Sequence, residues 1–214
     1  MEELQYTLLS DGPADKALMP ILTWLLRQYV PNIPVQSRWA DLRRLPRPPR
    51  ELHEKIRESV RLYSCDLLFV HRDAEAISLE VRLNEIRQAV SHASVENETS
   101  TVVCVVPVRM TEAWLLFDIS AIRQAAGNPN GTVSLNLPNL STVESLPDPK
   151  RVLHDILREA TELNTRRKKR FDTNKAVQRI PEFIEDFSPL RRLSAFIALE
   201  EKVKETIESQ RWND

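Results

Sequence analysis

The chain contains 214 residues with a formal net charge of −1; 42% of them are hydrophobic, 29% are charged and only 3 are glycine. A chain of this length usually has about 15 glycines, so the composition excludes collagen-like repeats, glycine-rich linkers and small, turn-dense β-sandwiches. The hydrophobic fraction can bury a full core, and we expect one domain, or one with a small appendage, that folds without disulfides or metal staples. No stretch of about 18 apolar residues occurs, so we expect a cytoplasmic protein without a membrane segment.

The first half of the chain alternates strand-like and helix-like segments. Short apolar, β-branched runs predict strands at residues 4–10, 33–39, 66–71 and 101–108. Apolar residues at helical spacing predict helices at residues 16–29, 51–63, 77–92 and 111–126. Pro20 predicts that the first helix begins later or kinks. This alternation predicts an α/β fold with a mostly parallel four-stranded sheet and helices on both faces.

In the helix expected at residues 77–92, four apolar residues share one face. Ile77, Val81, Ile86 and Val90 recur at near-helical spacing. We therefore expect these four side chains to point toward the core.

The second half of the chain is predicted to be helical and basic. Residues 128–149 are rich in Asn, Pro and Ser and predict a loop, and residues 190–210 predict a long helix. We expect an α/β domain at residues 1–127, the loop at 128–149, and a basic helical extension at 150–214 that packs on the first domain. The long helix is also a candidate homodimer contact.

A dense basic run lies in this extension: Arg166, Arg167, Lys168, Lys169 and Arg170. Such a run is often only a solvated face. Beside a carboxylate–metal site it would instead contact the backbone of DNA or RNA and release counterions. A second basic patch, with four arginines, lies in the proline-rich segment at residues 41–50.

Carboxylates follow three of the predicted strands. Asp11 and Asp15 follow the first, Asp73 and Glu75 the third, and Glu112 the fourth. The carboxyl ends of parallel strands share one edge of the sheet, so we expect these side chains to gather there. Clustered carboxylates repel one another, and a bound divalent cation such as Mg²⁺ usually compensates this repulsion. Helix capping, which also favours acidic residues at helix starts, explains each single residue equally well.

The motifs at these strand ends resemble the Toprim family. Asp-Gly-Pro-Ala-Asp at residues 11–15 resembles its first motif, Glu-Gly-x-x-Asp, and Phe-Val-His-Arg-Asp-Ala-Glu at 69–75 resembles its second, a strand followed by Asp-x-Asp. Pro107 and Glu-Ala-Trp-Leu at 112–115 are similar to an uncharacterised bacterial Toprim-like family related to the overcoming-lysogenization-defect nucleases. The resemblance covers roughly residues 4–120 and implies the Toprim/Rossmann-like form of the α/β fold.

This resemblance implies roles for the carboxylates. Asp11 stands where the family has a metal ligand or general acid/base, and Asp73 and Glu75 stand where its Asp-x-Asp pair binds Mg²⁺ or Mn²⁺. These three are therefore the candidate catalytic residues, and Asp15 and Glu112 are further candidate metal ligands. The chain has Asp in place of Glu at position 11 and Glu in place of Asp at position 75, which changes each reach by one methylene.

Two neighbours of the carboxylates are candidate phosphate contacts. Gly12 would let the backbone approach a phosphate closely, or it marks a plain tight turn. Arg72 would bind phosphate or pair with a nearby carboxylate. We interpret His71 as a strand-end residue rather than a base.

The resemblance implies a Toprim-type, Mg²⁺-dependent nuclease or phosphotransfer protein that acts on nucleic acid, with a role in antiviral defence. As an enzyme it would be a phosphodiester hydrolase. The alternative is a catalytically weak or inactive Toprim-like subunit that binds a partner ATPase. A third hypothesis is a site for a small anion at the strand ends. No Gly-x-Gly-x-x-Gly or Walker A motif is present, so the sequence gives little support to a nucleotide cofactor. The sequence alone leaves these three open.

Overall fold

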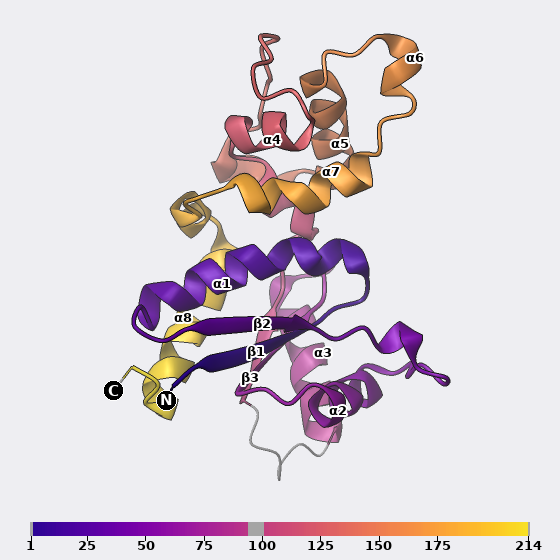
Figure 1. Ribbon diagram of the computed structural model, residues 1–214. Coiled ribbons are helices and arrows are strands. Elements are labelled where there is room, and N and C mark those ends of the chain that lie inside the picture. The colour runs from indigo at the N-terminus through magenta and orange to yellow at the C-terminus, as the bar shows by residue number, and fades with distance from the viewer. Residues whose placement is uncertain (1, 94–100, 214) are drawn as a thin grey trace.

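The computed structural model describes residues 2–93 and 101–213 and contains a single parallel sheet covered by helices (Figure 1). The strands are β1 (Leu4–Leu9), β2 (Val35–Trp39), β3 (Leu67–His71) and β4 (Thr101–Val105). The α-helices are α1 (Leu18–Tyr29), α2 (Leu52–Leu62), α3 (Leu79–His92), α4 (Ile119–Ala125), α5 (Pro149–Ala160), α6 (Thr165–Lys168), α7 (Thr173–Arg179) and α8 (Ser194–Gln210). The alternation of strands and helices predicted for the first half is confirmed.

The strand order is β2-β1-β3-β4, and all neighbouring strands run parallel. Side chains of β1 and β3 alternate between two apolar layers. Leu8 and Phe69 pack in the layer that contains α1, whereas Leu9 and Val70 pack in the layer that contains α2 and α3. Because both faces are covered, the two central strands are mostly apolar and almost entirely buried, as is typical of a buried parallel sheet.

The chain leaves β1 and β3 toward opposite faces of the sheet. The connection from β1 to β2 runs through α1 on one face, and the connection from β3 to β4 runs through α3 on the other. β1 and β3 are hydrogen-bonded neighbours, so their carboxyl ends form a topological switch point. Ligands of open parallel sheets bind at such a point, because the diverging connections leave a crevice there.

The start of α1 shows that the helix begins later than expected and is not kinked at Pro20 by a lost hydrogen bond. A 3₁₀ turn at Pro13–Ala17 precedes the helix, which begins at Leu18. Pro20 therefore lies in the first helical turn, where the missing N–H has no intrahelical acceptor and breaks no hydrogen bond. The helix begins later than its apolar pattern suggested.

The predicted inner face of α3 is partly wrong. Ile86 is fully buried, but Ile77 lies before the helix and Val81 is 55% exposed. The buried row is instead Arg82, Ile86 and Ala89, which share one helical face. The guanidinium of Arg82 pairs with Glu85 and lies 3.8 Å from Glu75 at the crevice.

The second half of the chain adds helices to the α1 side of the sheet, where α4, α5 and α7 lie beyond α1 (Figure 1). The last helix, α8, packs on β4 and α1 and begins at Ser194, after a 3₁₀ turn at Ser188–Arg192. Phe196 of α8 and the fully buried Trp114 meet edge to face, with ring centroids 5.4 Å apart. The apolar core of the sheet therefore continues into the C-terminal helices.

Among the residues described, no helix combines the length and apolarity needed to cross a lipid bilayer.

Candidate functional site

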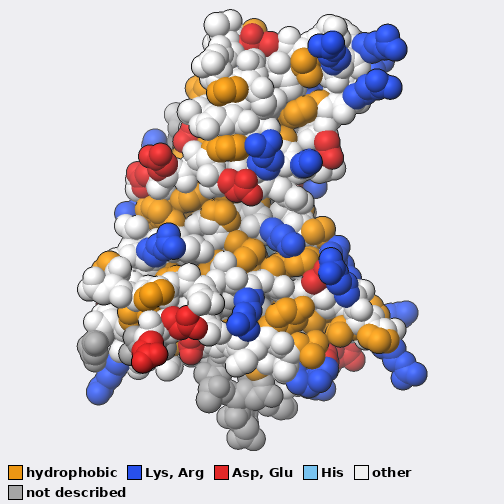
Figure 2. All heavy atoms as spheres, in the orientation of Figure 1, with side chains coloured by type: hydrophobic (Ala, Val, Ile, Leu, Met, Phe, Trp, Pro, Cys, Tyr) orange, Lys and Arg blue, Asp and Glu red, His pale blue; other side chains and the backbone are white. Residues whose placement is uncertain are grey.

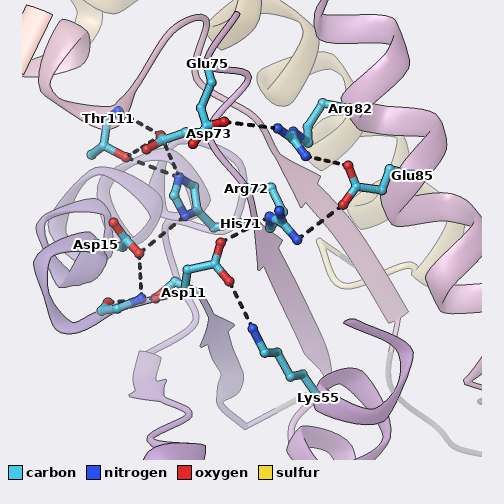
Figure 3. A network of polar contacts seen from close by, with 12 residues as sticks. Asp11, Asp15, Lys55, His71, Arg72, Asp73, Glu75, Arg82, Glu85 and Thr111 are labelled. Carbon is cyan, nitrogen blue, oxygen red and sulfur yellow. Dashed lines mark hydrogen bonds and ion pairs between the residues drawn. The ribbon is translucent and has the colours of Figure 1, made fainter. Parts of the chain in front are cut away.

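A pocket of about 340 Å³ lies at the carboxyl ends of β1 and β3. It is lined by Asp11, Gly12, Asp15, His71, Arg72, Asp73, Glu75 and Arg82. The fold thus brings together six residues predicted from the sequence, from two segments about 60 positions apart. Figure 3 shows how their polar side chains converge.

His71 occupies the centre of this pocket. Its side chain is only 2% exposed, and its Nε2 lies 3.2 Å from both Asp73 Oδ1 and Thr111 Oγ1. Within the described residues its Nδ1 has no hydrogen-bond partner, and it lies 3.7 Å from Asp15 Oδ2. The imidazole therefore lies between the turn after β1 and the turn after β3. The sequence interpretation of His71 as a plain strand-end residue missed this central position.

Asp73 is held by the segment that follows β4. The backbone N–H of Thr111 donates to Asp73 Oδ1 at 2.9 Å, and the Thr111 hydroxyl donates to the same oxygen at 3.2 Å. Backbone hydrogen bonds from Ala74 to Pro107 and from Glu75 to Arg109 join the two turns. Asp73 is thus fixed by groups from two neighbouring strand ends.

The carboxylate of Glu75 pairs with a different side chain from that of Asp73. Glu75 has a left-handed backbone, with φ of 54°, and its side chain is exposed. Its Oε2 lies 3.8 Å from Arg82 of α3. The structure therefore places the two acidic residues of the second motif on one pocket but gives them different partners (Figure 3).

Asp11 is flanked by two cations. Lys55 of α2 donates from Nζ to Asp11 Oδ1 at 3.1 Å, and Arg72 Nε lies 3.1 Å from Asp11 Oδ2. Arg72 also pairs with Glu85 at 3.2 Å, so positive and negative groups alternate along the rim. Of the two roles predicted for Arg72, the carboxylate pairing is the one observed. No motif in the sequence pointed to Lys55 as a member of the site.

Asp15 both caps the 3₁₀ turn and lines the pocket. The Gly12 N–H donates to Asp15 Oδ2 at 3.0 Å, as the capping interpretation predicted. Burial raises the pKa of Asp15, and the nearby His71 and the Gly12 N–H offset part of that rise. The charges of Asp73 and Asp11 raise this pKa further. Proton uptake by Asp15 is therefore coupled to the charge state of the other carboxylates.

Gly12 has an extended backbone that any residue can adopt, with φ of −152° and ψ of 172°. A Cβ at this position meets nothing within 4 Å. Neither conformation nor packing of the folded chain therefore requires glycine here, and the space beside it is open. By contrast, Gly127 has φ of +76° at the end of α4, where glycine is favoured.

Glu112 is not among the residues that line the pocket. It is 7% exposed, and its Oε1 lies 3.4 Å from Lys150 Nζ. Burial raises the pKa of Glu112; Lys150 offsets part of this effect, and the charge of Asp73 adds to it. The charge of the site therefore affects the pKa of Glu112, although Glu112 does not line the pocket.

Replacing Glu112 by glutamine is expected to raise the melting temperature at neutral pH and to change it little at pH 4. The folded state keeps the Glu112 proton at pH values where the unfolded chain has lost it. The stability gained from this proton is present below the unfolded pKa and is lost as the pH rises through the folded pKa. Melting curves between pH 4 and 7.5 measure the effect. The exposed replacement Glu80→Gln controls for net charge, and a pH-independent difference contradicts the prediction.

The basic run lies outside the pocket. Its residues fall on and just after α6, without a fully buried side chain. Figure 2 shows Lys and Arg side chains gathered at the tip of this region. The next helix, α7, packs against the 3₁₀ turn after β1, and Gln178 donates to the Pro13 carbonyl at 3.4 Å. The run is therefore connected to the site through α7 but does not line it.

The fit of a divalent cation depends on the donors. Asp11, Asp15 and Asp73 offer carboxylate oxygens on one pocket, the ligand type that Mg²⁺ prefers. Within residues 2–93 and 101–213, no three His, Cys, Asp or Glu side chains form a ready-made metal-binding group. The donor atoms are of the type that Mg²⁺ prefers. To bind the cation, Asp11 must exchange its ion pairs with Lys55 and Arg72 for the ion.

Fold and site together define a class: a doubly wound, parallel α/β protein with an acidic, arginine-containing pocket at its topological switch point. No protein-family model, curated protein or solved structure matches the chain. The residues of the pocket therefore provide the evidence for function.

Proposed function

We propose that this protein is a Toprim-type nuclease or related phosphotransfer protein that acts on nucleic acid with Mg²⁺ or Mn²⁺. The observation that carries the proposal is the meeting of carboxylates from β1 and β3 with Arg72 and Lys55 at the switch point. Carboxylates attract a divalent cation, and the two basic side chains suit a phosphate. The antiviral role rests on the family resemblance alone.

Each part of the pocket has a role in this proposal. Asp11, Asp15 and Asp73 would hold the cation, which would polarise the phosphate and stabilise the leaving oxygen. A phosphate that enters the pocket competes with Asp11 for Arg72 and Lys55, and this exchange frees Asp11 to act as a ligand. His71 and Thr111 keep the Asp73 carboxylate in position.

Cleavage assays on single-stranded and duplex DNA and RNA test the proposal. We expect cleavage with Mg²⁺ or Mn²⁺ that EDTA abolishes. Absence of cleavage of all four substrates with either metal contradicts the enzymatic function.

One observation favours the alternative of a non-catalytic, Toprim-like subunit that binds a partner ATPase. Asp11 and Glu75 already lie beside basic side chains, and Asp15 and Asp73 lie beside His71. Calorimetric titration with Mn²⁺ separates the two functions. Binding that Asp11→Asn weakens supports the nuclease, and absence of binding at millimolar Mn²⁺ supports the subunit.

Neutralising the basic run is expected to weaken nucleic-acid binding at least tenfold at low salt. A variant with Arg166, Arg167, Lys168, Lys169 and Arg170 replaced by glutamine loses up to five phosphate contacts. Each lost contact reduces the slope of log affinity against log salt by about 0.9 for duplex DNA. Fluorescence anisotropy at several salt concentrations measures this slope. Lys202→Gln with Lys204→Gln on exposed positions of α8 is the control, and an unchanged slope in the five-residue variant excludes the run as a nucleic-acid contact.

A further inference from the structure

A second pocket, of about 210 Å³, lies beside the first. It is built from the ends of β1 and β2, the proline-rich segment at residues 41–50, and α2. Trp39, Leu42, Pro48 and Pro49 give it apolar walls, whereas Arg43 and Lys55 bring positive charge. Apolar walls with a few polar groups at fixed positions are typical of small-molecule sites.

The indole of Trp39 is held in place by contacts on its edge and its face. Its Nε1 donates to Ser10 Oγ at 3.0 Å. Lys16 Nζ lies 4.3 Å from the ring centroid, and the Arg43 guanidinium lies 5.1 Å away. Arg43 is itself oriented by a 2.9 Å hydrogen bond to Asp41. The pocket therefore joins a fixed aromatic ring to a planar cation, two groups on which nucleobases stack.

The two pockets share their boundary. Asp11 lines both of them, and Lys55 lines the second while it pairs with Asp11. Arg72 contacts the other oxygen of the same carboxylate from the first pocket. A phosphate bound by Lys55 and Arg72 therefore lies at the boundary, with apolar space on the Trp39 side.

We propose that the Trp39 pocket binds the nucleobase of a nucleotide whose phosphate lies between Lys55 and Arg72. This inference rests on the proposed function and names its substrate class, a nucleoside phosphate within or at the end of a nucleic-acid strand. The base enters between Trp39 and the Arg43 guanidinium, which moves outward from its 5.1 Å separation to admit the base. Stacking tolerates every base, so the pocket selects nucleotides over other phosphates with little preference for sequence.

Calorimetric titration of the full chain in Mg²⁺ buffer tests the pocket with three probes: adenosine 5′-monophosphate, ribose 5-phosphate and inorganic phosphate. Because stacking contributes about 1–3 kcal/mol per base, we expect the nucleotide to bind about tenfold or more tightly than ribose 5-phosphate. Trp39→Ala removes this preference and leaves ribose 5-phosphate binding unchanged, whereas Trp39→Phe retains part of it. Lys55→Gln weakens all three probes alike.

Equal affinity of the wild-type chain for the nucleotide and ribose 5-phosphate overturns the inference, as does an undiminished preference in Trp39→Ala. Circular dichroism establishes that each variant is folded. If Trp39→Ala does not fold, Arg43→Ala provides the test, because it leaves the indole in place and removes the stacked cation. If the chain prefers the nucleotide but shows no divalent-dependent cleavage, the nuclease proposal is wrong and the nucleobase pocket stands. If it cleaves nucleic acid but shows no such preference, the nuclease proposal stands and the nucleobase pocket is wrong.

Discussion

Asparagine in place of Asp73 is expected to lower divalent-dependent cleavage roughly 10²- to 10³-fold, the range seen when one electrostatic contact is removed from an active site. The amide oxygen of asparagine still accepts the hydrogen bonds that Thr111 donates to Asp73. The negative charge that would bind the cation is lost. Alanine is a poorer test, because it leaves buried donors without a partner at a cost of about 1–3 kcal/mol.

The measurement is kcat/KM on the best nucleic-acid substrate, together with a melting curve for each variant. Asp155→Asn is the matched control, since Asp155 is an exposed carboxylate on α5, where it pairs with Arg151 and Arg158 of its own helix. Cleavage by a folded Asp73→Asn variant at the wild-type rate removes Asp73 from the site.

Truncating Phe196 to alanine is expected to cost about 3–5 kcal/mol of unfolding free energy, the usual penalty for a buried aromatic ring. Phe196 is fully buried and packs edge to face on Trp114. A loss of this size is a large fraction of the roughly 5–15 kcal/mol that stabilises a typical domain. The variant therefore tests whether α8 belongs to the cooperative core of the sheet.

Urea unfolding gives the free-energy difference, and the neighbouring residue provides the control. Ile197 is 41% exposed on the same helix, and its replacement by alanine is expected to change stability by about 0.5 kcal/mol or less. Equal, small effects of the two substitutions contradict the packing of α8 on the core.

Most of the fold could be predicted because its signals are local. A β-branched run such as residues 101–105 favours an extended backbone. The unbroken apolar run at residues 67–70 indicates burial on both faces, which the structure shows for β3 but only in part for the edge strand β4. The alternation with helices then leaves a parallel sheet as the economical arrangement. From that topology alone, Asp11, Asp15, Asp73 and Glu75 were expected at one edge, and the structure places them on one pocket.

The partners of those residues could not be predicted, because each depends on packing between distant segments. Lys55 reaches Asp11 only because α2 packs beside β1, and Thr111 reaches Asp73 only because the turns after β3 and β4 are hydrogen-bonded. The inner face of α3 was misassigned for the same reason, since the packing of α3 on β4 and α2 decides which residues are buried.

The sequence by itself determined the α/β class, the parallel order of elements and the acidic character of the strand ends, because backbone preference and hydrophobic periodicity act over neighbouring residues. Only the tertiary structure decided that His71 lies between Asp15 and Asp73, that Glu112 is buried outside the pocket lining, and that the Trp39 pocket adjoins Asp11. Such side-chain relations arise when segments far apart in the sequence meet and bury their polar groups together.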